Sequence, residues 1–316
     1  MSLFIDAHHH IYDLTGMPAG YPGRRGPAQK TAFGTDAELR KDYTHEMYRA
    51  DLAAMGGRAS VHIEAGRNPE DPVEESRWLS GLADEVGIPT ALVAYADLAR
   101  DDAASVLERH AACRRVRGIR QIVTNSGGLA KLQPEDSLYT REAWLRTVPL
   151  LRRFGMSFEM QAPPTVAAVA ADVARNNPDV TFVLLQCGHP IERSEDALAL
   201  WRAGLALLGA CPNVYVKLSG FYMMNPRETV EGVRSIIDQV VDAFGPHRCM
   251  MASNFPVDRL FIDGGGLRAT FDRALAGYSP AERAGMLGGT ASRVYRLDEL
   301  MDQGQRRSGD ADHAEP

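Results

Sequence analysis

The sequence predicts a parallel β/α barrel of eight strands, formed as one domain over residues 1–302 of the 316-residue chain. Two observations indicate this fold. Eight apolar strand segments alternate with helical segments at spacings of about 25 to 35 residues, the rhythm of repeated βα units. The competing doubly wound sheet normally carries a glycine-rich phosphate loop after its first strand, and neither GxGxxG nor GxxxxGK[ST] occurs in this sequence.

The strands are predicted from short runs rich in β-branched and other apolar residues. They cover residues 4–10, 59–64, 90–95, 116–122, 156–161, 181–185, 214–218 and 249–252. Parallel strands that are buried on both faces are expected to be this apolar.

Amphipathic segments between the strands predict the helices. They cover residues 44–55, 72–86, 101–113, 140–154, 164–176, 194–208 and 228–244, with two or three more between 265 and 297. Thr44 is the expected N-cap of the first helix. The Gly/Pro-rich stretch 15–35 predicts a long binding loop without regular structure, and the polar residues 303–316 predict a disordered tail.

Composition narrows the functional classes. A net charge of -6 and a pI near 5.9 argue against a nucleic-acid surface. No apolar run approaches a membrane span or a signal core, so we expect a cytoplasmic protein that acts on a small molecule; a homodimer stays open. The four cysteines form no CxxC pattern and are expected as buried free thiols, not disulfides.

The first predicted strand ends in the histidine run His8-His9-His10. Side chains alternate along an extended segment, so His8 and His10 should point one way and His9 the other. Two imidazoles at the end of a strand can bind a divalent metal or polarise an anionic substrate. An expression-tag remnant is the simpler explanation, but the run follows a hydrophobic strand and leads into Ile11-Tyr12-Asp13.

Polar residues recur where the other strands end, which is where barrels carry their chemistry. They are Glu64, Arg120, Gln161, Gln186, Lys217, Asn254 and Asp258. Several have an ordinary structural explanation: Lys217 can pair with a neighbouring carboxylate, and Arg120 can pair with Glu64 or Glu159. Gln161 and Gln186 can satisfy buried backbone, and His189 beside Pro190 is predicted as a loop residue.

These residues resemble the amidohydrolase superfamily, in its amidohydrolase-related branch of TIM-barrel lactonases and hydrolases. Asp6-Ala7-His8-His9-His10 looks like the DxHxH opening of that branch. Further similar segments follow in the same order: VHIEA at 61–65, EESRWL at 74–79, GIRQ at 118–121, NVYVKLSG at 213–220, SNFPVD at 253–258 and GTASRVY at 289–295. The resemblance covers about residues 4–297.

The resemblance implies a working set of the HxH pair, a histidine after the sixth strand and an aspartate after the eighth. This chain departs from it twice, with Gln186 in place of the histidine and Asn254 in place of the aspartate. An amide is a poor transition-metal ligand and cannot act as a general base. Both a weakly bound divalent metal, Zn²⁺ or Mn²⁺ on His8 and His10, and a metal-free site therefore stay open.

We expect a hydrolase that opens a lactone or a related small anionic ester or amide. His8 and His10 would polarise the carbonyl, with Asn254 and Asp258 as further catalytic groups. Glu64, Arg120, Gln161, Gln186 and Lys217 would bind the substrate. The base could be Asp258, Glu64 or a neutral histidine, although Asp258 is also a candidate structural cap. The alternatives are a decarboxylase or lyase on the same fold and a catalytically silent binding protein.

Overall fold

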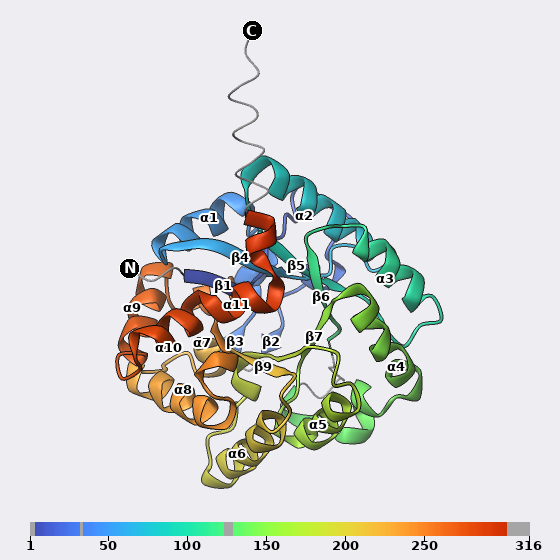
Figure 1. Ribbon diagram of the computed structural model, residues 1–316. Coiled ribbons are helices and arrows are strands. Elements are labelled where there is room, and N and C mark those ends of the chain that lie inside the picture. Colours follow the sequence, from blue (N-terminus) through green and yellow to red (C-terminus); the bar gives the residue numbers. More distant parts are fainter. Residues whose placement is uncertain (1–3, 32–33, 123–128, 302–316) are drawn as a thin grey trace.

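The computed structural model describes residues 4–31, 34–122 and 129–301. Eight parallel strands form one sheet in the order β1-β4-β5-β6-β7-β8-β9-β10, and helices surround it (Figure 1). The strands are β1 Phe4–His9, β4 Gly57–Ile63, β5 Ala91–Tyr95, β6 Val116–Arg120, β7 Ser157–Met160, β8 Phe182–Leu184, β9 Val214–Leu218 and β10 Cys249–Met251. The predicted barrel is confirmed, and each strand lies within about two residues of its predicted bounds.

The helices follow the predicted alternation. They are α1 His45–Ala54, α2 Val73–Val86, α3 Ala103–Ala111, α4 Glu142–Thr147, α5 Ala167–Asn176, α6 Glu195–Gly209, α7 Phe221–Met224, α8 Val230–Phe244, α9 Gly264–Ala274, α10 Pro280–Ala284 and α11 Thr290–Tyr295. Thr44 occupies the N-cap position of α1, but its hydroxyl bonds to Glu46 instead of a helix N–H group. Ser194 and Thr229 do cap α6 and α8 through their hydroxyl groups.

Three details differ from the sequence prediction. The 15–35 stretch contains two short antiparallel strands, β2 Lys30–Thr31 and β3 Gly34–Thr35, so the expectation of no regular structure there was wrong. The predicted helix 140–154 ends early as α4 and continues as a 3₁₀ segment, Val148–Phe154. Pro149 explains the change, because it lacks an N–H group and clashes with the carbonyl four residues earlier. The short helix α7 was not predicted.

The barrel interior is filled by small and branched side chains and by the chain's own C-terminal segment. Ile5, Val61, Val93 and Met250 belong to this inner cluster. Tyr295 at the end of α11 packs among them, and its carbonyl accepts a bond from the Arg117 side chain at the start of β6. In Figure 1, α11 (red) lies across the centre of the ring of strands. One end of the barrel is therefore covered by α11.

Strand β1 contains one extra residue relative to β4. Asp6 pairs with Ser60 and His9 with His62, so three steps on β1 match two on β4. A bulge of this kind reverses the alternation of side chains beyond it. Asp6, before the bulge, points outward to Tyr48 of α1, whereas His8, two residues later and beyond the bulge, turns toward the interior beside His10.

The closure of the barrel depends on Asp6. Its carboxylate accepts bonds from the Ser253 N–H (2.8 Å) and hydroxyl (2.6 Å) and from the Tyr48 hydroxyl (2.8 Å). The backbone continues the join, since Asn254 N–H donates to His8 and His10 N–H donates to Phe255. The last strand is thereby fixed beside the first.

Other predictions can be checked on the same structure. All four cysteines are free; Cys187, Cys211 and Cys249 are buried and Cys113 is half-buried. Within the described ranges, no helix is long and apolar enough to cross a lipid bilayer. The predicted disordered tail, residues 303–316, lies outside the described residues.

Candidate active site

His8 and His10 lie side by side at the C-terminal end of β1, as predicted. Their ring centroids are 5.1 Å apart and the rings are nearly perpendicular. His10 Nδ1 lies 2.8 Å from the carbonyl oxygen of Ile63. A carbonyl can only accept, so Nδ1 carries the proton and Nε2 holds the lone pair in the neutral ring.

Both imidazoles are held neutral. Burial lowers the pKa of His8 well below its ordinary 6.5, and the nearby Lys217, His10 and Arg120 lower it further. Burial and then Arg120 and Arg24 lower the pKa of His10 in the same way. Among the residues that the structure describes, neither ring nitrogen of His8 has a hydrogen-bond partner. Two neutral imidazoles therefore lie side by side, and His8 retains unused hydrogen-bonding capacity.

His9 has a different role. Its ring stacks on Tyr48 at 3.6 Å between centroids, on the outer side of β1, so it points away from His8 and His10 as predicted. His62, from the neighbouring strand, also faces outward and contacts Glu75 of α2 at 3.4 Å. These two histidines belong to the packing between the barrel and its helices.

Lys217 is fully buried inside the barrel and forms an ion pair with Glu159, with 2.7 Å between Nζ and Oε2. The hydroxyl of Tyr295 donates to the other oxygen of Glu159 at 2.6 Å. Burial lowers the pKa of Lys217 to about 8, although Glu159 opposes the shift. Pairing with a neighbouring carboxylate, one of the two predicted outcomes, is thus observed.

Arg120 and Glu64 form a second buried pair above this layer. Arg120 Nε donates to Glu64 Oε1 at 2.8 Å, and Nη2 donates to the Glu64 carbonyl at 2.9 Å. Burial raises the pKa of Glu64, while Arg120 counteracts the rise. Of the two predicted partners of Arg120, Glu64 is the one found.

The two amides that follow the sixth and eighth strands of the barrel, Gln186 and Asn254, are bonded to each other. Gln186 Nε2 donates to Asn254 Oδ1 at 2.9 Å, and Asn254 Nδ2 donates to Asp258 Oδ1 at 3.2 Å. Asp258 also accepts from Met223 N–H at 2.8 Å, within α7. Burial raises the pKa of Asp258 to about 7 despite these bonds. Asp258 therefore holds α7 in place, the structural alternative that the sequence had left open.

The segment Gln186–His189 has an unusual backbone. All four residues have positive φ angles, between 49° and 70°, a region that residues other than glycine seldom adopt. Gly220 allows this turn to pack closely, since a Cβ atom there would lie 3.0 Å from Gln186 Cγ. Strain of this kind is typical of functional sites and aims Gln186 at Asn254.

Gln161 and His189 are two further strand-end residues. Gln161 is half-buried, and its carbonyl accepts a hydrogen bond from the Tyr139 hydroxyl at 3.0 Å. His189 is buried and lines a separate hollow of about 100 Å³ with Pro164, Pro190 and Leu200. His189 is thus a buried loop residue away from the pair.

The sequence reading missed Tyr295, Met223 and the outward role of Asp6. Tyr295 reaches Glu159 across 136 positions of sequence, and no local pattern signals that contact. Met223 belongs to α7, which was not predicted, and its sulfur lies 3.7 Å from Asn254 Nδ2. The bulge between Asp6 and His9 adds one residue to β1 relative to β4 and has no signature in the composition of the strand.

The donor set does not complete a zinc site. Catalytic zinc normally has three protein ligands from histidine, carboxylate or cysteine. The mouth offers the two imidazoles of His8 and His10, and the next groups are the mutually bonded amides of Gln186 and Asn254. Across the described parts of the chain, no three His, Cys, Asp or Glu residues are grouped so that they could hold a metal.

Comparisons with known proteins agree with this architecture. The family model described as "Amidohydrolase" matches residues 5–297. An uncharacterized protein of Sinorhizobium fredii is 31% identical, covering 93% of this chain and 98% of its own. An L-fucono-1,5-lactonase of Burkholderia multivorans is 29% identical, covering 95% and 98%. A crystal structure of an amidohydrolase from Burkholderia multivorans with bound zinc superimposes with a TM-score of 0.76 at 26% identity, covering 94% and 100%.

Proposed function

Because the chain belongs to the amidohydrolase family, we propose that it is a hydrolase that opens a lactone or a related small anionic ester or amide. A lactonase among its relatives supports the reaction class. The observation that carries the proposal is the fixed tautomer of His10, whose Nδ1–H is held by the Ile63 carbonyl while Nε2 keeps its lone pair. A neutral imidazole with a defined lone pair is a general base.

In the proposed reaction, His10 Nε2 accepts a proton from water as the water oxygen attacks the lactone carbonyl carbon. The carbonyl oxygen gains negative charge in this step. The positive potential of Lys217 and Arg120, which lowers the pKa of His8, would stabilise that charge. His8 supplies a hydrogen bond to the same oxygen. The His10 imidazolium then returns the proton to the leaving ring oxygen, which yields a hydroxy acid.

The remaining polar residues act around this pair. Both other candidate bases are engaged elsewhere: Glu64 accepts from Arg120, and Asp258 accepts from Asn254 and from α7. We therefore assign Arg120 to the substrate's anionic group, Gln186 and Asn254 to its oxygens, and Gln161 to the rim of the mouth. Lys217 contributes its charge without touching the substrate, and Asp258 positions Asn254.

Zinc is bound in the crystal structure of the similar amidohydrolase from Burkholderia multivorans. Within the described part of this chain, His8 and His10 are the two imidazoles on which a metal could bind, and the proposed steps use side chains only. Hydrolysis by the purified protein should accordingly persist after treatment with a chelator and dialysis. Loss of hydrolysis under chelation, with recovery on adding Zn²⁺ or Mn²⁺, would contradict the assigned base.

The central test replaces His10 with glutamine. Turnover of the best lactone from a screen should fall about a hundredfold or more in kcat, because the base is lost. His45→Gln, at the exposed start of α1, is the matched control and should retain the wild-type rate. Wild-type kcat in His10→Gln would refute the proposal, and release of carbon dioxide from a carboxylic acid substrate would favour a decarboxylase instead.

A further inference from the structure

We propose that the active site carries an apolar subsite beside Glu64, which takes an alkyl or aryl substituent on the ring of the lactone. This inference rests on the proposed lactonase function and specifies its substrate class. The subsite is a pocket of about 320 Å³ whose lining includes Glu64, Pro69, Pro72, Tyr95 and Ile122. That volume lies at the lower end of the range found for small-molecule sites, about 300–1,000 Å³.

The pocket is connected to the proposed site through Glu64. Glu64 lines the pocket and accepts a hydrogen bond from Arg120, to which the substrate's anionic group is assigned. A substituent next to that anionic group would extend into this space. We therefore infer that the pocket continues the mouth of the barrel on the Glu64 side.

Most of the surface exposed in the pocket is carbon, although five polar side chains also line it: Glu64, Arg67, Asn68, Glu75 and Gln121. Arg67 and Asn68 donate to Glu74, and Glu75 accepts from Ala65 N–H. Ile122, just beyond β6, is 47% exposed, an unusual state for a large β-branched side chain next to a barrel strand. Pro69, Pro72 and Tyr95 add carbon surface. The buried polar residue Gln121 is already occupied, since it accepts from Leu98 N–H and Trp144 and donates to Asp97. Such a wall favours burial of hydrocarbon over the hydroxyl groups of a sugar lactone.

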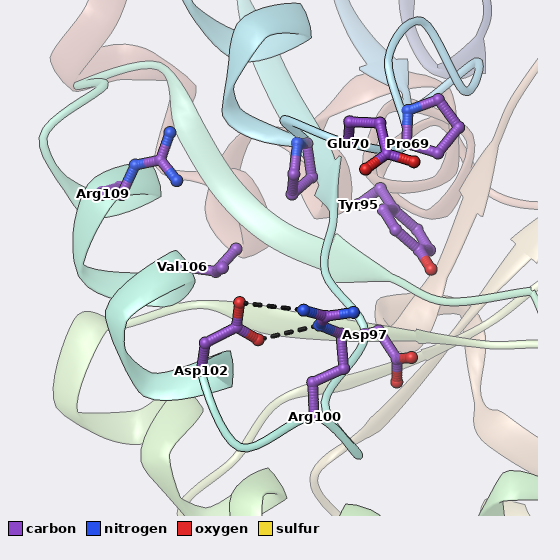
Figure 2. A pocket seen from close by; sticks show the side chains of 9 residues that line it. Pro69, Glu70, Tyr95, Asp97, Arg100, Asp102, Val106 and Arg109 are labelled. Atoms are coloured by element: carbon purple, nitrogen blue, oxygen red, sulfur yellow. Dashed lines mark hydrogen bonds and ion pairs between the residues drawn. The ribbon is translucent and has the colours of Figure 1, made fainter.

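A second hollow, of about 210 Å³, shares Pro69, Pro72 and Tyr95 with the first. Figure 2 shows Arg100 in this hollow joined to Asp102, with Arg109 and Glu70 also on its wall. Its cations are neutralised, because Arg100 pairs with Asp102 at 2.9 Å and Arg109 with Asp71 at 2.5 Å. Three carboxylates line this hollow against two guanidinium groups, so the substituent should end without an anionic group.

The test measures kcat/KM for δ-valerolactone, δ-octalactone, δ-decalactone and an aldonolactone. Each added methylene should raise kcat/KM by about threefold to fourfold as long as the chain fits, since burial favours each by a similar amount. Ile122→Asn should reduce the preference for δ-decalactone over δ-valerolactone at least fivefold. Leu200→Asn, at an equally exposed leucine on α6, is the matched control and should keep the preference.

Binding of the open product, 5-hydroxydecanoate, separates the subsite from the reaction. Calorimetry should give weaker binding to Ile122→Asn than to the wild type or to Leu200→Asn. If no lactone is hydrolysed but this difference is found, the proposed function fails and the subsite stands. If lactones are hydrolysed without dependence on chain length, or if the aldonolactone is preferred, the subsite is refuted and the function stands. Absence of any binding also refutes the subsite.

Discussion

At the scale of single residues, hydrogen bonds and neighbouring charges set the protonation state of each buried ionisable group in the site. The carbonyl of Ile63 fixes the tautomer of His10, and the charges of Lys217 and Arg120 oppose protonation of the pair. The amides Gln186 and Asn254 bind each other instead of moving protons. The sequence predicted His10, Arg120, Gln186 and Asn254 at or just beyond strand ends, where the strands of a barrel meet at one mouth, and they lie at those positions.

Their partners could not be predicted in the same way. Lys217 and Glu159 pair across β9 and β7, which are not adjacent, and the pairing depends on how the strands are staggered around the barrel. Asp258 was predicted either as a base or as a structural cap. Its bond to Met223 N–H in α7 favours the cap, and α7 was not predicted from the sequence. Register and tilt are properties of the closed barrel and have no local signature.

The pKa of Asp258 gives a first prediction at this scale. In the unfolded chain the carboxyl group has its ordinary pKa of 3.8, whereas burial raises its pKa to about 7 in the folded protein. The folded state thus binds more protons between these values, and this group makes stability fall as pH rises from about 4 to 7. Asp258→Asn should remove this contribution to the pH dependence of the free energy of unfolding.

Urea denaturation at pH 5 and pH 8 measures the effect. The free energy of unfolding of Asp258→Asn, relative to the wild type, should be higher at pH 8 than at pH 5 by about 1–3 kcal/mol. Loss of the contact to α7 adds an offset that is the same at both pH values. Asp263→Asn, at the cap of α9, serves as the control and should show no such difference. A pH-independent offset alone would argue that Asp258 is ionised in the fold at pH 5.

At the scale of elements, the hydrophobic pattern predicted every barrel strand and most helices, because buried parallel strands need continuous apolar runs. The errors fall where other effects dominate. Pro149 converts the end of one helix to a 3₁₀ segment, and two two-residue strands pair within a stretch rich in glycine and proline. Elements as short as α7 are fixed by tertiary contacts, here Asp258, more than by propensity.

Close packing of α6 against α8 gives a second prediction. A Cβ atom added at Gly209, the last residue of α6, would lie 2.3 Å from the carbonyl oxygen of Ala243. Backbone cannot give way as a flexible side chain can, so Gly209→Ala should destabilise the protein by about 1–3 kcal/mol. Gly81 in α2 has open space around its Cβ position. Gly81→Ala should stabilise by up to about 1 kcal/mol, because alanine favours helix. Thermal and urea unfolding of both variants test the contrast; equal effects would refute the packing argument.

At the scale of the whole molecule, contacts between the first strand and the segment after the last strand close the barrel. The C-terminal helix α11 packs against the barrel interior. Asp6 joins β1 to Ser253 beyond β10, and Tyr295 joins α11 to Glu159 of β7. Both are charge-assisted bonds within the protein interior, where an unpaired partner is costly. The global fold therefore depends on a few buried carboxylates.

The Asp6 join gives a third prediction. Asp6→Asn keeps the shape but loses the charge and one acceptor oxygen. An NH₂ group then faces either the Ser253 and Tyr48 hydroxyls, which both donate to Oδ2, or the N–H groups of Ser253 and His8, which donate to Oδ1. Stability to urea should fall by about 2–3 kcal/mol. Asp13→Asn, whose carboxylate accepts only from the exposed Gly16 N–H among the contacts described, should cost less than about 1 kcal/mol. An equal loss in both variants would show that Asp6 does not close the barrel.

The bulged first strand also has a consequence for the order of events during synthesis. Asp6 lies two residues before His8, and its contacts with Ser253 span 247 positions of sequence. Contacts so distant in sequence form slowly, because the whole intervening loop must be ordered first. A nascent chain that has emerged only as far as β9 would hold its histidines on an unpaired edge. We therefore expect the positions of His8 and His10 to be fixed only by the final closure of the barrel, when Asn254 and Phe255 bond to them, so a chain cut before β10 should lack this arrangement.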